Sequence, residues 1–322
     1  MLESRAIKDY ARRAGFDLCG IVPCRHLAEN EEYFREWLAQ GYGADLHYLE
    51  RNLDKRFDVA RLVEGAKSVI VCAVNYKSPR SLGYPTDSHT KIASYACNAD
   101  YHTSIKEMLA KLYESLKEIV PTLRARSFTD SAPLVEKQLA VDAGLGWIGR
   151  QSLLVTPQFG TFVLLGELVI DAEVDCYDRP FEGSRCGECR RCIEACPNSA
   201  ILPTKCIDAR RCISRLTIEK ETDSATDAVG LNGWIFGCDE CQSCCPHNRT
   251  TPFAVNPHFA HPFDPATLSA EDWFTMDEEA FSATFGNTPL LRSGLQRIKQ
   301  NIEKIGTIRA DSARRESGNR TR

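Results

Sequence analysis

The chain has 322 residues, of which 43% are hydrophobic and 26% are charged, and its formal net charge is −4. This composition is typical of a folded protein with a sizeable core, and the length predicts two domains or one large domain with an insert. The acidic balance excludes nucleic-acid binding through overall charge, so such binding needs a local basic patch. The charged N-terminus lacks the apolar stretch of a signal peptide, and no apolar run approaches the ~20 residues of a membrane span. We therefore expect a cytoplasmic protein with no membrane partner.

Helix and strand patterns alternate through the first 172 residues. Helices are expected at 3–14, 31–40, 101–119 and 133–143, and strands at 17–22, 66–75, 92–96, 124–128, 152–156 and 161–171. The run at 66–75 is apolar throughout, which is typical of a strand buried on both faces. The last two strands are expected to form a hairpin across 157–160. The alternation predicts an α/β (α+β) domain with a mixed sheet.

Cysteine spacing marks a second unit at residues 173–250. Eleven of the fifteen cysteines lie between Cys176 and Cys245. The first group has the bacterial ferredoxin spacing and consists of Cys186, Cys189, Cys192 and Cys196, followed by Pro197. The second group consists of Cys238, Cys241, Cys244 and Cys245, followed by Pro246. Clustered cysteines in a cytosolic protein indicate metal or redox chemistry, and this spacing predicts a ferredoxin-like module with two [4Fe–4S] clusters.

The ferredoxin pattern assigns seven of the eight cluster ligands. In two-cluster ferredoxins the last cysteine of each run binds the other cluster. One cluster is therefore expected on Cys186, Cys189, Cys192 and Cys245. The other is expected on Cys196, Cys238 and Cys241, and spacing leaves its fourth ligand open among Cys244, Cys212 and Cys206. A four-cysteine zinc site is the alternative, although three residues before a final Cys-Pro are unusual for zinc ribbons.

The remaining chain carries weaker signals. Residues 251–308 read as a mixed segment that packs on the core, with a helix at 294–305, and residues 309–322 are polar and charged, which predicts a disordered tail.

The segment 129–150 suggests a specific function. Asp130 ends a strand just before a helix, and Gly144, Gly146 and Gly149 surround Trp147. Taken alone, the aspartate is typical of a helix N-cap and the glycines of turns. Together with Tyr95-Ala96, 100–102, Gly166-Glu167, 208–214 and both cysteine groups, however, the chain resembles the epoxyqueuosine reductases over about residues 1–300.

The resemblance implies a reaction and its cofactors. These enzymes use cobalamin and two [4Fe–4S] clusters to reduce the epoxide of epoxyqueuosine, at the wobble position of tRNA, to queuosine. Cobalamin would lie between the α/β domain and the cluster module, and an external low-potential donor would supply electrons. Cys212 would complete the second cluster, so Cys244 would not be a ligand. Asp130 would be the proton donor, with its pKa raised by burial against the corrin.

The resemblance also implies binding residues. The cobalamin contacts would be Arg56, Asp130, Gln151, Leu154, Leu165, Ser214, Asp239 and Glu240. No DxHxxG motif is present, because Ile105 stands where glycine is needed, so no histidine is expected to bind cobalt. Tyr101 and His102 would line the substrate pocket. A basic set around the clusters would contact tRNA phosphates and comprises Arg190, Arg191, Lys205, Arg210, Arg211 and Arg215. Many members carry a C-terminal helical-repeat domain that helps hold tRNA; without it, we expect a more economical tRNA contact and a monomer.

Two other functions fit parts of the pattern. A reductive dehalogenase would share cobalamin and two clusters, but such enzymes usually carry an export leader. A plain electron carrier would need only the cysteine module, and it does not require ~170 residues of α/β domain ahead of the clusters.

Overall fold

The computed structural model describes residues 2–85, 88–219, 230–259, 264 and 267–319, with side chains described as far as residue 306. Its centre is a four-stranded sheet in the order β1 (Leu18–Pro23), β2 (Ser68–Asn75), β7 (Val163–Ile170) and β4 (Ala125–Phe128). Neighbouring strands in this sheet are antiparallel. Every residue of β2 is buried, as its unbroken apolar run predicts.

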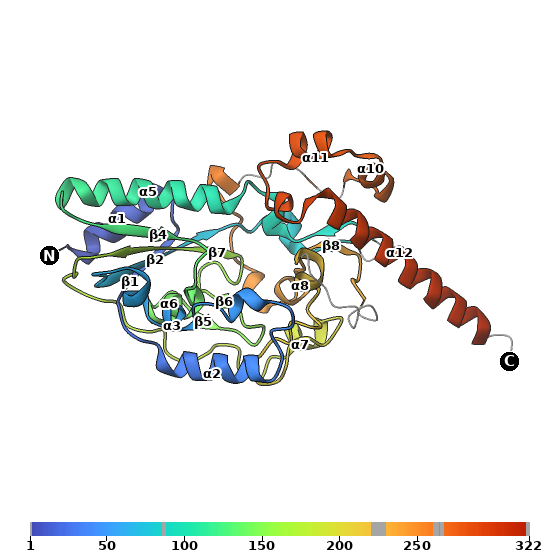
Figure 1. The fold of residues 1–322 in the computed structure, drawn as a ribbon, viewed down its shortest axis with the longest axis horizontal. Coiled ribbons are helices and arrows are strands. Elements are labelled where there is room, and N and C mark those ends of the chain that lie inside the picture. The colour runs from blue at the N-terminus through green and yellow to red at the C-terminus, as the bar shows by residue number, and fades with distance from the viewer. Residues whose placement is uncertain (1, 86–87, 220–229, 260–263, 265–266, 320–322) are drawn as a thin grey trace.

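Two helices cover one face of the sheet (Figure 1), namely α1 (Ser4–Ala14) and α5 (Tyr101–Ile119). The face of α5 that carries Ile105, Leu109 and Leu112 packs against alternate residues of β2 and β7. Gly166 on β7 permits this close packing, because a Cβ there would lie 2.4 Å from Cγ2 of Ile105.

Other helices cover the opposite face. They are α2 (Ala28–Ala39), α3 (Leu53–Arg56), α4 (Val59–Leu62) and α6 (Glu136–Asp142). Alternate residues of β2, namely Val69, Val71 and Ala73, belong to the apolar cluster between the sheet and these helices. Helix α6 packs on the sheet, and its first turn lies near the end of β4, beside the candidate site.

The cysteine module lies beside the sheet and is tied to the first domain. It contains α7 (Arg191–Ala195), α8 (Ile213–Ile218), β8 (Trp234–Phe236) and α9 (Glu240–Ser243). Strand β8 pairs in parallel with β3 (Lys91–Ile92). The main sheet is antiparallel and the parallel pair forms a separate two-stranded sheet; the expected α/β class with a cysteine module is confirmed.

The C-terminal segment packs on β8 through a further apolar cluster. Its helices are α10 (Ala270–Thr275), α11 (Glu278–Phe285) and α12 (Gly294–Asn319), and Figure 1 shows α12 extending away from the body of the molecule. Shorter 3₁₀ helices occur at His47–Leu49, Pro79–Leu82, Ser94–Cys97, Pro246–Asn248, Pro257–Phe259 and Pro289–Arg292. Within the described part of the chain, no helix is both long enough and apolar enough to cross a membrane.

Three expectations differ from the structure. The strand expected at 92–96 ends at Ile92, and a 3₁₀ turn follows. The expected hairpin forms at its turn, where an antiparallel bridge joins Thr156 and Gly160, but it does not continue, because β6 (Leu154–Val155) pairs with β5 (Trp147–Ile148) while β7 joins the main sheet. The β5–β6 pairing requires glycine at position 146, because a Cβ there would lie 2.1 Å from the carbonyl oxygen of Val155.

The third difference concerns the tail. Helix α12 continues to Asn319, although disorder is expected from residue 309. Alanine, arginine and glutamate in this stretch are strong helix formers, so a polar composition is compatible with a helix that extends from a packed first half. Residues 320–322 lie outside the described part.

Candidate active site

A cavity of about 470 Å³ lies between the sheet and the cysteine module. The first domain contributes Val163, Leu164 and Leu165 of β7, together with residues that follow β4. The module contributes Ile213 and Ser214 of α8 and several cysteines. The cavity therefore has an apolar wall on one side and thiols on the other.

Asp130 lies on this cavity, two residues after β4, with a left-handed backbone (φ 53°). Its Oδ2 accepts a 2.5 Å hydrogen bond from the hydroxyl of Tyr101 and lies 3.6 Å from Nε2 of His102. Tyr101 and His102 form the first turn of α5, and the N-cap Asp100 holds His102 through Nδ1 at 2.8 Å. The end of β4 and the start of α5 thus bring an acid, a phenol and an imidazole together.

Hydrogen bonding sets the charges in this group. The contact with His102, assisted by the hydrogen bond of Tyr101, holds the pKa of Asp130 below its ordinary value although burial opposes this effect. The hydrogen bond to Asp100 and then the contact with Asp130 raise the pKa of His102 to about 9. Among the protein groups alone, the partners of Asp130 therefore outweigh desolvation, and the rise expected from burial against the corrin stays a prediction.

Two glutamates near Asp130 are not among the predicted site residues. Glu136, at the start of α6, accepts a 2.6 Å hydrogen bond from the backbone N–H of Asp130 and lines the cavity. Glu167 on β7 is fully buried. Burial raises the pKa of Glu136 to about 7 and that of Glu167 well above its usual range. The sequence contained a sign of this group, because Glu167 is a charged residue inside the otherwise apolar run of β7, where burial is costly.

The structure brings eight cysteines together in two sets. The thiol of Cys245 interacts electrostatically with those of Cys186, Cys189 and Cys192. The thiol of Cys212 interacts with Cys196, and that of Cys241 with Cys238 and Cys212. All four cysteines of the second set line the cavity, namely Cys196, Cys212, Cys238 and Cys241.

The extra thiols of the module lie elsewhere. Cys244 donates to the carbonyl of Cys241 at 3.5 Å, and its thiol interacts with Cys192 and Cys245 of the first set. Cys206 lies 2.7 Å from the hydroxyl of Tyr33 on α2. Cys244 also interacts with Cys241, but among the cysteine candidates for a fourth ligand Cys212 is the one that lines the cavity with the second set.

The arrangement suits clusters better than single ions. Among the described residues, no group of three or more histidine, cysteine, aspartate or glutamate side chains surrounds a single ion site. An iron–sulfur cube takes one thiolate at each of four iron atoms, so its ligands are spread more widely than those of zinc.

Six of the eight predicted cobalamin contacts line the cavity, namely Asp130, Gln151, Leu165, Ser214, Asp239 and Glu240. The other two do not. Leu154 is buried in the core, and its neighbour Leu153 lines the cavity instead, because side chains alternate along β6. Arg56 is also buried, with its guanidinium 5.6 Å from the ring of Phe34.

The cavity lining fits a corrin. Nε2 of Gln151 is buried without a hydrogen-bond partner, so it is available to an amide group of a ligand. Leucine, isoleucine and valine side chains provide an apolar surface. None of the described residues that line the cavity is a histidine.

The glycine-rich segment contacts the first cysteine set. Nε1 of Trp147 donates to Sγ of Cys186 at 3.4 Å, and Arg150 donates to the carbonyl of Gly187 at 2.7 Å. The ring of His247 packs edge-on against Trp147 at 4.9 Å. This segment therefore positions the loop that carries Cys186, a role that the turn interpretation of its glycines missed.

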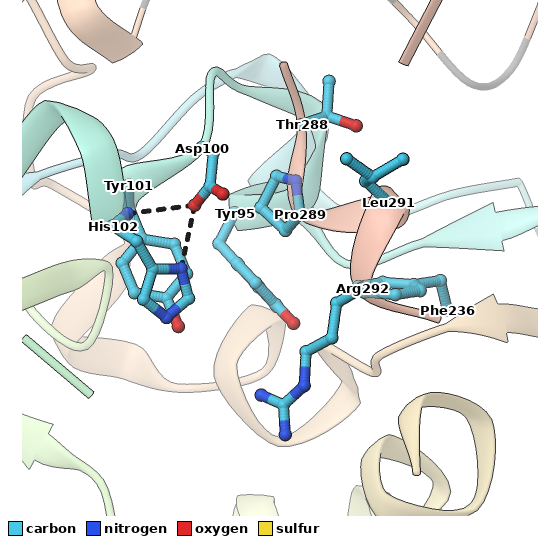
Figure 2. A pocket seen from close by; sticks show the side chains of 9 residues that line it. All are labelled: Tyr95, Asp100, Tyr101, His102, Phe236, Thr288, Pro289, Leu291 and Arg292. Carbon is cyan, nitrogen blue, oxygen red and sulfur yellow. Dashed lines mark hydrogen bonds and ion pairs between the residues drawn. The ribbon is translucent and has the colours of Figure 1, made fainter. Parts of the chain in front are cut away.

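A second pocket of about 310 Å³ adjoins the cavity (Figure 2). Tyr95 and Tyr101 line both spaces. Figure 2 shows Tyr101 and His102 stacked on one side and Arg292 on the other, and the stacked rings are 4.1 Å apart. Arg292 lies 3.4 Å from Glu219, and its side chain is 52% exposed. The pocket is therefore accessible and carries a cation at its edge.

The predicted basic set is divided by burial. Its exposed members are Arg190, Arg191, Lys205, Arg210 and Arg211. Arg215 is buried in an ion pair with Asp45, so it is not available to phosphate. The expectation for Arg215 is therefore wrong, because a helix position next to a basic run does not reveal which side faces the core.

The chain matches known proteins over almost its entire length. The family model described as "Epoxyqueuosine reductase QueG, DUF1730" matches residues 56–131, and that of a "4Fe-4S double cluster binding domain" matches residues 185–248. An epoxyqueuosine reductase of Cyclobacterium marinum is 40% identical over 304 residues, covering 94% of this chain and 96% of that protein. One from Leadbetterella byssophila is 38% identical over 308 residues, covering 95% and 99%. The structure of epoxyqueuosine reductase from Streptococcus thermophilus matches with a TM-score of 0.80 at 25% identity, covering 94% of this chain and 80% of that chain.

Proposed function

This chain belongs to the epoxyqueuosine reductase family, and from that premise we propose which of its residues perform the reduction. The protein is an oxidoreductase that reduces epoxyqueuosine to queuosine in tRNA with cobalamin and two [4Fe–4S] clusters. When bound, these groups supply the two electrons of the reaction. The single observation that carries the assignment of residues is that Asp130 and four cysteine thiols line one cavity.

The cysteines would hold the clusters in an order that suits electron transfer. Cys196, Cys212, Cys238 and Cys241 would bind a cluster beside the cavity. Cys186, Cys189, Cys192 and Cys245 do not line the cavity and would bind an outer cluster. Such a cluster would accept electrons from an external low-potential donor. Gln151, Leu165, Ser214, Asp239 and Glu240 hold the cobalamin between the two domains.

Asp130 delivers a proton to the epoxide oxygen. Its carboxyl lies on the cavity and contacts Tyr101, which also lines the neighbouring pocket. Cofactor and substrate that fill these spaces remove water from the carboxyl, and this desolvation raises its pKa towards that of a donor. Tyr101 and His102 orient the carboxyl before the substrate arrives.

The second pocket receives the modified nucleoside of tRNA. Its volume lies at the lower end of the usual range for small-molecule sites, and its aromatic residues can stack on a base that is turned out of an anticodon loop. Arg292 at its edge suits a flanking phosphate. The five exposed basic residues of the module extend this contact. A tRNA substrate agrees with a cytoplasmic location.

The deciding experiment compares wild type with Asp130→Asn. Anaerobically purified enzyme with added cobalamin should contain about eight iron and one cobalt per chain in both proteins. Conversion of epoxyqueuosine in tRNA, measured by nucleoside mass spectrometry, should fall by about 10²–10⁴-fold in Asp130→Asn.

Asp9→Asn is the control, because Asp9 is an exposed residue of α1, and it should retain wild-type conversion. Full conversion by Asp130→Asn would refute the acid assignment. Failure of the wild type to bind cobalamin would refute the assignment of the cavity.

A further inference from the structure

The reduction needs two protons, and Asp130 carries one. When an epoxide becomes an alkene, both C–O bonds break, a C=C bond forms and the oxygen leaves as water. The balance is two electrons and two protons per epoxide. The cofactors supply the electrons. The second proton has to reach the reacting oxygen beside Asp130, so its source among the side chains around the cavity is a separate question.

Glu167 is a buried carboxyl with no assigned role. It is 0% exposed, and neither of its carboxyl oxygens has a hydrogen-bond partner that meets ordinary geometry within the described structure. It lies opposite Phe128 of β4 and on the same face of β7 as Leu165, which lines the cavity. A carboxylate is very costly in such a place, whereas a protonated carboxyl is tolerated.

Glu136 connects this buried group to Asp130. Its carboxyl lines the cavity and accepts the backbone N–H of Asp130 at 2.6 Å. The carboxyls of Glu136 and Glu167 interact with each other, and both interact electrostatically with Asp130. Three carboxyls therefore lead from the sheet interior to the reaction site.

The neighbouring charges do not neutralise the two glutamates. Lys137 interacts electrostatically with Glu136, and its Nζ donates to the carbonyl of Ser152 at 2.7 Å. Tyr101 interacts with both Asp130 and Glu136, and the buried thiol of Cys72 interacts with Glu167. The remaining groups, His102, Arg292, Tyr95 and Tyr48, act on Asp130. Burial of Glu136, followed by repulsion from Asp130, raises its pKa to about 7, so this pair holds a proton near neutral pH.

We propose that Glu136 and Glu167 store the second proton of the reduction and that Glu136 passes it to Asp130 after Asp130 has protonated the epoxide oxygen. In this transfer the O–H bond of Glu136 breaks and a new O–H bond forms on Asp130. Asp130 then gives this proton to the departing oxygen, which leaves as water. The inference rests on the proposed role of Asp130.

The stored proton can be observed without substrate. Infrared spectra of the substrate-free holoenzyme at pH 6, in H₂O and in D₂O, should contain the C=O band of a protonated buried carboxyl that shifts in D₂O. Glu167→Gln should lose this band. A spectrum of Glu167→Gln that matches the wild type would overturn the proposal.

Kinetics then test the transfer. Glu136→Gln keeps an oxygen that accepts the N–H of Asp130 but carries no transferable proton. Its kcat should fall by on the order of 10–100-fold. In wild type the rate should fall as pH rises through about 7, because Glu136 loses its proton. This decline should vanish in Glu136→Gln and persist in Glu136→Asp.

The outcomes separate the possible roles. Glu114→Gln, on the exposed side of α5, is the control and should match wild type. Wild-type kcat in Glu136→Gln would overturn the relay, and so would a lower kcat that keeps the decline near pH 7, since that pattern indicates a structural role. A wild type that shows the carboxyl band but does not reduce epoxyqueuosine would refute the proposed function and leave the stored proton intact.

Discussion

The hydroxyl of Tyr101 donates a 2.5 Å hydrogen bond to Oδ2 of Asp130, and Nε2 of His102 lies 3.6 Å from the same oxygen. Tyr101 lines both the large cavity and the neighbouring pocket. The contact therefore links the proposed cofactor and substrate spaces at the residue that is proposed to donate a proton. It also makes the charge of His102 a measurable property of the site.

His102 should titrate at an unusually high pH. The hydrogen bond to Asp100 and the contact with Asp130 raise its pKa to about 9, above the ordinary value of 6.5. The charged pair therefore stabilises the fold fully below pH 6.5, and this contribution disappears as pH rises through about 9. The expected loss in His102→Gln is on the order of 1–2 kcal/mol at pH 6.5, since the ring is partly exposed.

Thermal melts and NMR of labelled histidines provide the measurement. The difference in Tm between wild type and His102→Gln should be larger at pH 6.5 than at pH 9.5. His47→Gln is the control, because His47 is a surface residue with 65% side-chain exposure. A His102 signal that titrates near pH 6.5 would contradict this prediction.

Cys212 and Cys244 should behave differently when replaced by serine. The thiol of Cys212 interacts with those of Cys196 and Cys238, which line the same cavity, whereas the thiol of Cys244 interacts with those of Cys192 and Cys245. Cys212→Ser should lose about four of eight iron atoms, and Cys244→Ser should retain nearly all of them. Iron analysis and the EPR spectra of the reduced proteins distinguish the two variants. The reverse result would restore the simple ferredoxin spacing, with Cys244 as the ligand.

Periodicity and spacing predicted the parts of the molecule that local sequence controls. The apolar residues at three- and four-residue intervals predicted α5 with its observed bounds, and the unbroken apolar run predicted β2. Ferredoxin spacing identified seven cysteines of the two sets. The eighth, Cys212, lies outside both runs, and only the family resemblance indicated it.

Tertiary contacts decided the remaining site residues. Arg56 and Arg215 look like binding residues in sequence, but Arg56 is buried and does not line the cavity, and Arg215 is buried in an ion pair with Asp45. Glu136, in contrast, does not look like a site residue in sequence, because its position at the start of a helix is ordinary. Its place in the site depends on its contacts with Asp130 and Glu167. Burial and contacts of this kind depend on the tertiary packing of strands and helices, which local sequence patterns do not specify.

The indole of Trp147 should tune the outer cluster. Its N–H donates to Sγ of Cys186 at 3.4 Å. A hydrogen bond to a cluster ligand stabilises the reduced cluster, which carries one more negative charge, and so raises its reduction potential. Trp147→Phe should therefore lower the potential of that cluster by about 20–60 mV, while the inner cluster keeps its potential. Redox titration followed by EPR measures both. Trp273→Phe is the matched control, because the indole N–H of Trp273 has no partner in the described structure; equal potentials in Trp147→Phe and wild type would contradict this role.

Arg292 should contribute to tRNA binding and not to the chemical step. Its guanidinium lines the second pocket and pairs with Glu219 at 3.4 Å, so a phosphate must compete with this carboxylate. Arg292→Gln should raise the KM for tRNA about tenfold at nearly constant kcat and reduce the slope of log KM against log salt by about 1. Glu219→Gln should lower KM, because it frees the arginine for the phosphate.

Arg12→Gln tests whether any arginine on the surface has the same effect. Arg12 lies on α1 with 71% side-chain exposure, far along the chain from the pocket residues, and its replacement should leave both KM and the salt slope unchanged. If Arg292→Gln lowered kcat and left KM and the salt slope unchanged, Arg292 would act on the reacting groups near Asp130, with which it interacts electrostatically, and not on a phosphate. Measuring kcat and KM at several salt concentrations therefore decides between a binding role and a catalytic role for this residue.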